Sequence, residues 1–213
     1  MASQTQQLEN PVVPNLGYPT EVYERRHFNE NNGSLTIYFK KLAAVLGSLF
    51  GPRGGRFMNN PYGAFQSTAD QTAAVVDTAY AMTFNTVDYA NGVSVASNSR
   101  ITVADAGIWN LQWSGQFQNT DTQIHDARIW LKINGTVVTG STGYISVPSS
   151  HGGIDGHSIV GWNYFLSLDA TDYVELWWET DSTMVSIQTY AASGNYPSTA
   201  SLIATMSFVS NIT

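Results

Sequence analysis

From residue 62 onward, apolar and polar residues alternate with a period of two, which is the pattern of β-strands with one buried face. The clearest stretch is 108–117, where Trp109, Trp113 and other apolar residues alternate with Asn, Gln and Ser. The same pattern marks seven more stretches: 79–84, 100–103, 128–138, 158–168, 173–179, 184–190 and 202–209. No helical pattern interrupts them, which predicts a mainly β fold, an antiparallel jelly-roll β-sandwich over residues 62–213.

Asn134-Gly135 interrupts the stretch 128–138. An Asn-Gly pair between two alternating runs favours a two-residue hairpin turn, because both positions tolerate positive φ. We therefore expect a hairpin at this point of the sandwich.

In the residues that precede the Gly-rich linker, the spacing of apolar residues changes to the helical period of 3.6. An apolar stripe with 3,4 spacing begins after Asn32 and Ser34, either of which can cap a helix, and ends before Gly51-Pro52. The sequence predicts one short α-helix and a Gly-rich linker over residues 32–61. The stripe, a candidate surface for self-association or docking, consists of Leu35, Tyr38, Phe39, Leu42, Val45, Leu46 and Leu49. Both a coiled coil and docking on a partner or on the sandwich remain open.

Residues 1–31 contain Pro11, Pro14 and Pro19, which exclude a helix or a central strand around them. We expect an extended arm here. It is either a tail without a partner or an attachment device that docks through apolar anchors. The candidate anchors are Val12, Val13, Leu16 and Tyr18.

Charge separates these two parts of the chain. Up to Pro61 there are 6 basic and 4 acidic residues, whereas the remainder has 3 basic and 12 acidic ones. An acidic sandwich is unsuited to nucleic acid, because phosphate contacts need Lys and Arg. No apolar run approaches the roughly 20 residues that span a bilayer, so no membrane insertion is expected. Only 12% of the residues are charged and 12% are aromatic, which suits sheet surface buried against other subunits.

Candidate catalytic and metal-ligating residues are few. The chain has no Cys, no serine in a Gly-x-Ser-x-Gly elbow, and only a solvated-looking pair in Glu179 and Asp181. We therefore expect no enzyme and no cofactor. His151, Asp155 and His157 share the loop 149–157; a polar surface loop is the favoured interpretation, and a metal there stays open.

Three aromatic residues of the sandwich are candidates for contact with another molecule. Trp130 alternates with buried-type residues and shares the face of Arg128 and Lys132, while Trp177 shares the face of Glu175 and Glu179. Tyr190, at the end of the stretch 184–190, joins them. Such residues line a subunit interface or stack on sugar rings; an assembling jelly roll favours the interface.

Several segments resemble trimeric jelly-roll domains of the complement and tumour necrosis factor type. Residues 99–113 are similar to their strand–turn–strand motif, 165–176 to a later Leu-x-Leu strand and turn, and 201–208 to their last strand. Residues 60–65 and 162–165 are closest in style to versions from virion proteins of tailed bacteriophages of the marine and cyanobacterial type. The resemblance covers about residues 62–210 and implies a homotrimer.

The resemblance implies a virion structural protein, either a fibre or knob or a decoration of the capsid. The N-terminal segment would attach it to other virion proteins of the capsid, neck or tail, and the sandwich would be exposed on the particle, assembled in the bacterial cytoplasm. The alternative is a receptor- or carbohydrate-binding module of a tail fibre that binds a glycan on the host surface.

Overall fold

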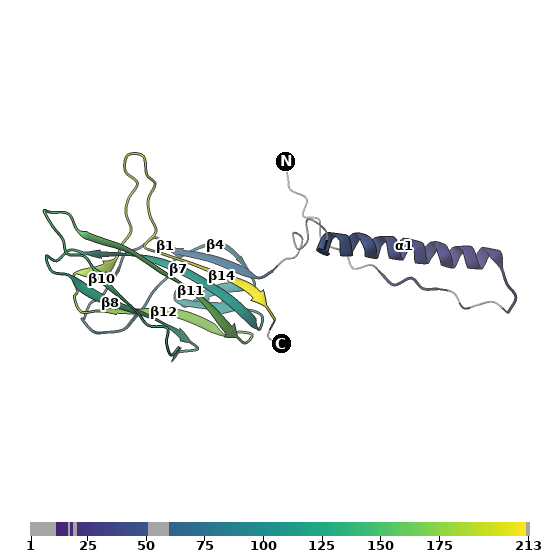
Figure 1. Ribbon diagram of the computed structural model, residues 1–213, viewed down its shortest axis with the longest axis horizontal. Coiled ribbons are helices and arrows are strands. Elements are labelled where there is room, and N and C mark those ends of the chain that lie inside the picture. Colours follow the sequence, from purple (N-terminus) through teal and green to yellow (C-terminus); the bar gives the residue numbers. More distant parts are fainter. Residues whose placement is uncertain (1–11, 17, 19–20, 51–59, 212–213) are drawn as a thin grey trace. The chain divides into compact units, whose positions relative to one another are not determined.

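The computed structural model describes residues 12–16, 18, 21–50 and 60–211, apart from the side chains of residues 48–50. In this part of the chain there are one helix and two antiparallel sheets (Figure 1). The chain divides into two compact units, Met1–Asn59 and Asn60–Thr213. All the described strands belong to the second unit, and the predicted mainly β sandwich preceded by one helix is confirmed.

Helix α1 runs over Arg25–Phe50 and has 26 residues. The prediction of a start at residue 32 was wrong, because residues 25–31 of the expected extended arm are helical as well. Arg26 Nε donates to Glu30 Oε1 over 2.9 Å, one turn along the helix, and such i,i+4 pairs stabilise a helical turn. The expected cap Ser34 lies inside the helix and donates its hydroxyl to the Glu30 carbonyl over 3.0 Å. No helix in the described part of the chain is long and apolar enough to cross a bilayer.

The apolar stripe of α1 is only partly shielded. Leu35, Tyr38, Leu42 and Val45 are partly buried, while the candidates Phe39 and Leu46 are exposed at 58% and 43%. The side chain of Leu49 lies outside the described residues. The anchor residues that precede the helix are all exposed: Val12 86%, Val13 74%, Leu16 40% and Tyr18 94%. The Gly-rich part of the predicted linker, 51–56, also falls outside the described residues.

The first sheet has β7 as its central strand. β11 pairs with one edge of β7 over its full length, and β14 and β13 share the other edge one after the other. From β14 the sheet continues through β1 to β4, and β2 pairs with β13. The strands are β1 (Tyr62–Ser67), β2 (Gln71–Thr72), β4 (Thr86–Asn91), β7 (Gly107–Asn119), β11 (Gly156–Leu168), β13 (Val185–Ile187) and β14 (Leu202–Ser210).

The second sheet is ordered β10-β8-β12-β6-β5, with β3 paired to β12 and β9 to β8. The β8–β9 turn is the predicted hairpin: Asn134 and Gly135 have φ values of 49° and 79°, as a two-residue type I′ turn requires. The strands are β3 (Tyr80–Ala81), β5 (Val93–Ala96), β6 (Arg100–Val103), β8 (His125–Ile133), β9 (Thr136–Val137), β10 (Gly143–Val147) and β12 (Tyr173–Thr180).

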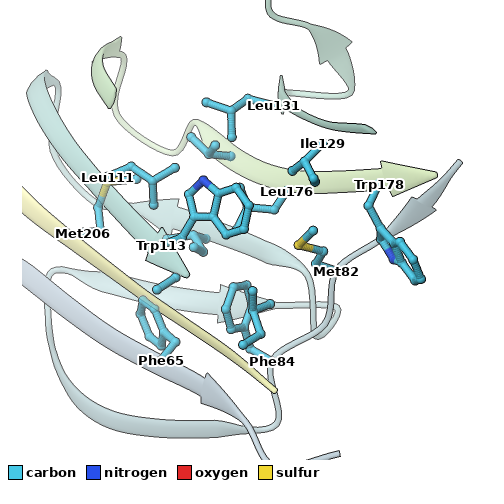
Figure 2. Packing of buried hydrophobic residues seen from close by; sticks show 14 of the residues in the cluster. Phe65, Met82, Phe84, Leu111, Trp113, Ile129, Leu131, Leu176, Trp178 and Met206 are labelled. Atoms are coloured by element: carbon cyan, nitrogen blue, oxygen red, sulfur yellow. The ribbon is translucent and has the colours of Figure 1, made fainter. Parts of the chain in front are cut away.

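The core lies between the two sheets and is set by the alternation that the sequence displays. Odd-numbered positions of β7 point inward, and Trp109, Trp113 and Phe117 are at most 5% exposed. Side chains from both sheets meet there (Figure 2): Phe65, Leu111, Trp113 and Met206 from the first, and Ile129, Leu131, Leu176 and Trp178 from the second. Burial of these large side chains is the main stabilising contribution to the sandwich.

One contact between the sheets requires glycine. Trp162 of β11 lies over Gly143 of β10, and a Cβ at that position would overlap the indole. The next inward residue, Tyr164, donates its hydroxyl to the Ser141 carbonyl over 2.8 Å. The edge strand β11 of the first sheet is thereby fixed to the edge strand β10 of the second.

The strand predictions hold best where the alternation is strongest. Stretches 100–103, 108–117, 158–168 and 202–209 correspond to β6, β7, β11 and β14. Stretch 79–84 contains only the short β3. Met82 and Phe84 are buried, but their N–H groups donate to the carbonyls of Leu176 and Asn98, and these bonds do not form a continuous ladder. Strands β1, β4, β5 and β10 were not predicted. Each has only four to six residues, so any alternation covers few inward positions.

Two indoles of β7 differ in one hydrogen bond. Trp109 Nε1 donates to the Asp105 carbonyl over 3.3 Å, whereas Trp113 Nε1 is buried without a partner among the described residues. Each ring has one aromatic neighbour, Phe208 at 5.5 Å and Trp162 at 5.2 Å between centroids. The pair is therefore a matched test of what a buried N–H contributes.

We expect Trp109→Phe to lower the free energy of unfolding by about 1 kcal/mol more than Trp113→Phe does. The first change removes a hydrogen bond together with volume, whereas the second removes an unsatisfied donor. Urea denaturation with an unchanged m-value would measure the difference. A decrease in the free energy of unfolding that is equal or larger in Trp113→Phe than in Trp109→Phe would contradict the prediction.

Candidate functional site

The outer face of the second sheet collects cations and aromatic rings. Ile129 and Leu131 of β8 and Leu176 of β12 are buried, so their neighbours along each strand point away from the core. We call this outward set the cation–aromatic face. It consists of Arg100, Arg128, Trp130, Lys132, Tyr144, Tyr173, Glu175, Trp177 and Glu179.

The register brings two sequence candidates together. Trp130 and Trp177 are directly opposite each other in the antiparallel pair of β8 and β12. Trp177 Nε1 donates to Glu175 Oε2 over 3.3 Å, and Lys132 Nζ lies 3.4 Å from the centre of the Trp177 ring. Trp177 is thus already covered by a cation, and Trp130 is the indole that lines open space.

Each of the three cations on this face stacks on a ring. Besides Lys132 on Trp177, the Arg100 guanidinium lies 4.5 Å from the Tyr173 centroid and that of Arg128 lies 5.7 Å from the Tyr144 centroid. Attraction between a cation and the negative face of a ring contributes about 0.5–1 kcal/mol at exposed sites. The stacking orders long side chains that would otherwise move freely.

Carboxylates compensate two of the cations. Arg128 Nη1 donates to Glu179 Oε1 over 2.7 Å and approaches Asp77 Oδ1 at 3.4 Å. The hydrogen bond to Glu179 raises the pKa of the Arg128 guanidinium above its ordinary value. Arg100 Nε lies 3.5 Å from Glu175 Oε1. Within the described residues, Lys132 forms no ion pair.

A shallow depression of about 350 Å³ opens over Trp130. Its lining combines an aromatic floor with donors and acceptors at the rim, and the two cations lie at positions 128 and 132 on either side of Trp130 along β8. It is lined by Arg128, Trp130, Lys132, Val137, Thr142, Tyr144 and Glu179. Its size is within the range of pockets that take small ligands.

The third aromatic candidate, Tyr190, lies elsewhere. Its hydroxyl donates to Gln118 Oε1 of β7 over 3.1 Å and lies 2.9 Å from His157 Nδ1 of β11. Burial is the main cause that raises the pKa of the Tyr190 phenol, with smaller contributions from Asp155 and Asp70. Tyr190, which follows β13 in the chain, therefore contacts strands of the first sheet and shares no surface with the Trp130–Trp177 pair.

The loop 149–157 uses its polar side chains for contacts within the protein. Gln118 Nε2 donates to Asp155 Oδ2 over 2.5 Å, and His157 contacts Tyr190. In residues 12–16, 18, 21–50 and 60–211, no three His, Cys, Asp or Glu side chains are grouped closely enough to hold a metal ion.

A second polar cluster lies around His125. His125 Nε2 is 2.9 Å from Asp121 Oδ2, and Nδ1 is 3.1 Å from Asp181 Oδ1. Both ring nitrogens thus face carboxylates. Glu179 and Asp181 are two positions apart but have different partners: Glu179 pairs with Arg128, and Asp181 with His125. The cluster connects the loop after β7 with the end of β12.

A scan against models of known protein families found no match for this chain. A search of curated proteins likewise found no similar sequence. The resemblance to trimeric jelly-roll domains of phage virion proteins therefore stays a prediction.

We expect the Asp121–His125 contact to make stability depend on acidic pH. The His125 hydrogen bond is the largest cause that lowers the pKa of Asp121 below its ordinary 3.8. A carboxyl whose pKa is lower in the folded state stabilises the fold above the unfolded pKa, and this contribution disappears as the pH falls through the folded value.

Asp121→Asn should therefore reduce the free energy of unfolding at pH about 6, and the difference from the wild type should vanish as the pH falls below 3.8. Urea denaturation over this pH range measures it. Asp105→Asn is the control, because the Asp105 carboxylate forms no ion pair with any described residue. A difference in the free energy of unfolding between Asp121→Asn and the wild type that persists below pH 3.8 would contradict the prediction.

Proposed function

We propose that this protein is a structural component of a bacteriophage particle, which assembles as a homotrimer through its sandwich and attaches to the particle through its N-terminal segment. It is not an enzyme. The observation that supports this best is the distribution of charge between the two sheets. The sequence resemblance supports a place in the virion, and the chemistry of the first sheet supports assembly.

The outer face of the first sheet is free of charge at its centre. Strands β1, β7, β11 and β14 contain no Lys, Arg, Asp or Glu. Ile159 and Phe165 of β11 are exposed at 76% and 65%, and Ile203 of β14 at 45%. The outward positions between them hold Asn, Gln, Ser and Thr. A chain with a net charge of −7 can bury this face against a copy of itself without burying charge.

The edge of the same sheet supports this proposal. β11 has 13 residues, and in the described part of the chain it pairs with β7 alone. Its second edge presents backbone N–H and C=O groups, which native proteins usually cover. A neighbouring subunit that packs over the first sheet would cover both the apolar side chains and this edge.

The cation–aromatic face is less suited to contact between copies. It contains five charged side chains, whereas the cores of interfaces are depleted of charge. The geometry therefore favours ligand contact over subunit contact for Trp130 and Trp177.

We expect the full chain to have a mass in solution of three times 23.2 kDa by light scattering, and Ile159→Lys to reduce it to that of one chain. The lysine would place a charge in the uncharged face. Ile124→Lys is the matched control, because Ile124 is 65% exposed in a loop outside that face. A wild type that is monomeric at high concentration, or an Ile159→Lys trimer, would contradict the proposal.

Attachment by α1 makes a separate prediction. Leu42→Glu places a charge in the apolar stripe, and Ala43→Glu places the same charge at an exposed neighbour on α1. Particles of the phage that encodes this chain should incorporate the Ala43→Glu protein and lack the Leu42→Glu protein, as measured by immunogold imaging and by mass spectrometry of purified particles.

The solution mass of the Leu42→Glu protein separates the two roles left open for the stripe. A retained trimer assigns the stripe to docking on the particle, whereas a lost trimer assigns it to self-association. Purified particles that lack the wild-type protein would contradict the virion proposal.

A further inference from the structure

All cations of the sandwich unit lie on one face. Arg100, Arg128 and Lys132 are the only Lys or Arg residues after Pro61, where 12 acidic residues surround them in sequence. Each points outward from the second sheet, and each stacks on an aromatic ring. An acidic unit repels anions over most of its surface, so this face is where an anionic group can bind.

Lys132 provides the uncompensated charge. Glu175, directly opposite it in the register, accepts hydrogen bonds from Ser99 and Trp177 and lies beside Arg100. Glu175 is only 5% exposed, so its carboxylate is committed to these partners. The Lys132 ammonium, ordered on the Trp177 ring, is left to bind an acid from outside.

The floor of the depression suits a ring with apolar C–H groups. Trp130 is partly buried between its neighbours, and its indole face is negative at the centre, which attracts C–H bonds of a saturated ring. Around it, Arg128 offers donors, Glu179 an acceptor, and Thr142 both. Hydroxyl groups need donors and acceptors together, so this lining suits a polyol better than a hydrocarbon.

We propose that the cation–aromatic face binds a carboxylated sugar of an acidic polysaccharide. The sugar ring stacks on Trp130, the Lys132 ammonium binds the carboxylate, and Arg128, Glu179 and Thr142 hydrogen-bond the hydroxyls. The site lies within one chain. Its existence is therefore independent of the assembly proposed above, although three copies on one particle would bind a polymer far more tightly than one.

The probes are short oligosaccharides of galacturonate, mannuronate and guluronate, titrated calorimetrically into the full chain. Methyl-esterified forms of the same oligomers are the matched neutral ligands. We expect at least one uronate to bind and its ester to bind about tenfold more weakly, because the charge-assisted hydrogen bond is lost. Raising the ionic strength from about 0.05 M to about 0.5 M should weaken only the acid form.

Three variants separate the roles. Trp130→Ala should weaken binding of both acid and ester by about tenfold or more. Lys132→Gln should weaken the acid only, so that acid and ester bind alike. Tyr89→Ala is the control; Tyr89 is 71% exposed on β4 of the other sheet, and its loss should leave binding unchanged. An unchanged far-UV circular dichroism spectrum and a cooperative urea transition verify that each variant is folded.

The proposal is overturned if none of the three uronates binds, if wild-type protein binds acid and ester equally, or if Trp130→Ala binds as the wild type does. Single-stranded DNA that competes for the face with higher affinity than any uronate would assign it to nucleic acid instead. The solution mass, measured in parallel, reports on assembly alone and distinguishes failure of this site from failure of the trimer.

Discussion

The inward alternation of β7 is the constraint on which the sandwich depends. Trp109, Trp113 and Phe117 fill the space between the sheets, while both edges of the strand are paired, with β11 on one side and with β14 and β13 on the other. A slip of one residue would move every inward aromatic to solvent and bring Asn and Gln into the core. The register of the neighbouring strands, and with it the pattern of both outer faces, follows from this one strand.

The same register separates two surfaces of different chemistry. The outer positions of the first sheet carry amides, hydroxyls and exposed aliphatic groups, which can be buried against a copy at little electrostatic cost. The outer positions of β6 and β8 carry the cations of the unit, each ordered on a ring. A face of the first kind suits assembly and a face of the second kind suits an anionic ligand, so a single sandwich can do both.

Residue types alone identified part of the candidate site. Trp130 and Trp177 are recognisable because each interrupts a polar face. Nothing in the sequence shows that they are opposite each other, since that depends on the pairing of β8 with β12, whose opposed residues are 41 or more positions apart. The contribution of Tyr144 was missed because β10 has only five residues and its pairing with β8 is not visible in the local pattern. The start of α1 was missed because its first turns are polar, and side-chain bonds such as Arg26–Glu30 stabilise them without an apolar stripe.

The sequence by itself determined the mainly β class, the strands with strong alternation, the Asn134-Gly135 hairpin and the inward face of β7, because each of these depends on local period or turn chemistry. Only the tertiary structure decided which strands are neighbours, that Lys132 covers Trp177 and leaves Trp130 open, and that the Tyr190 side chain contacts the other sheet. These depend on contacts between segments remote along the chain, which local pattern does not specify.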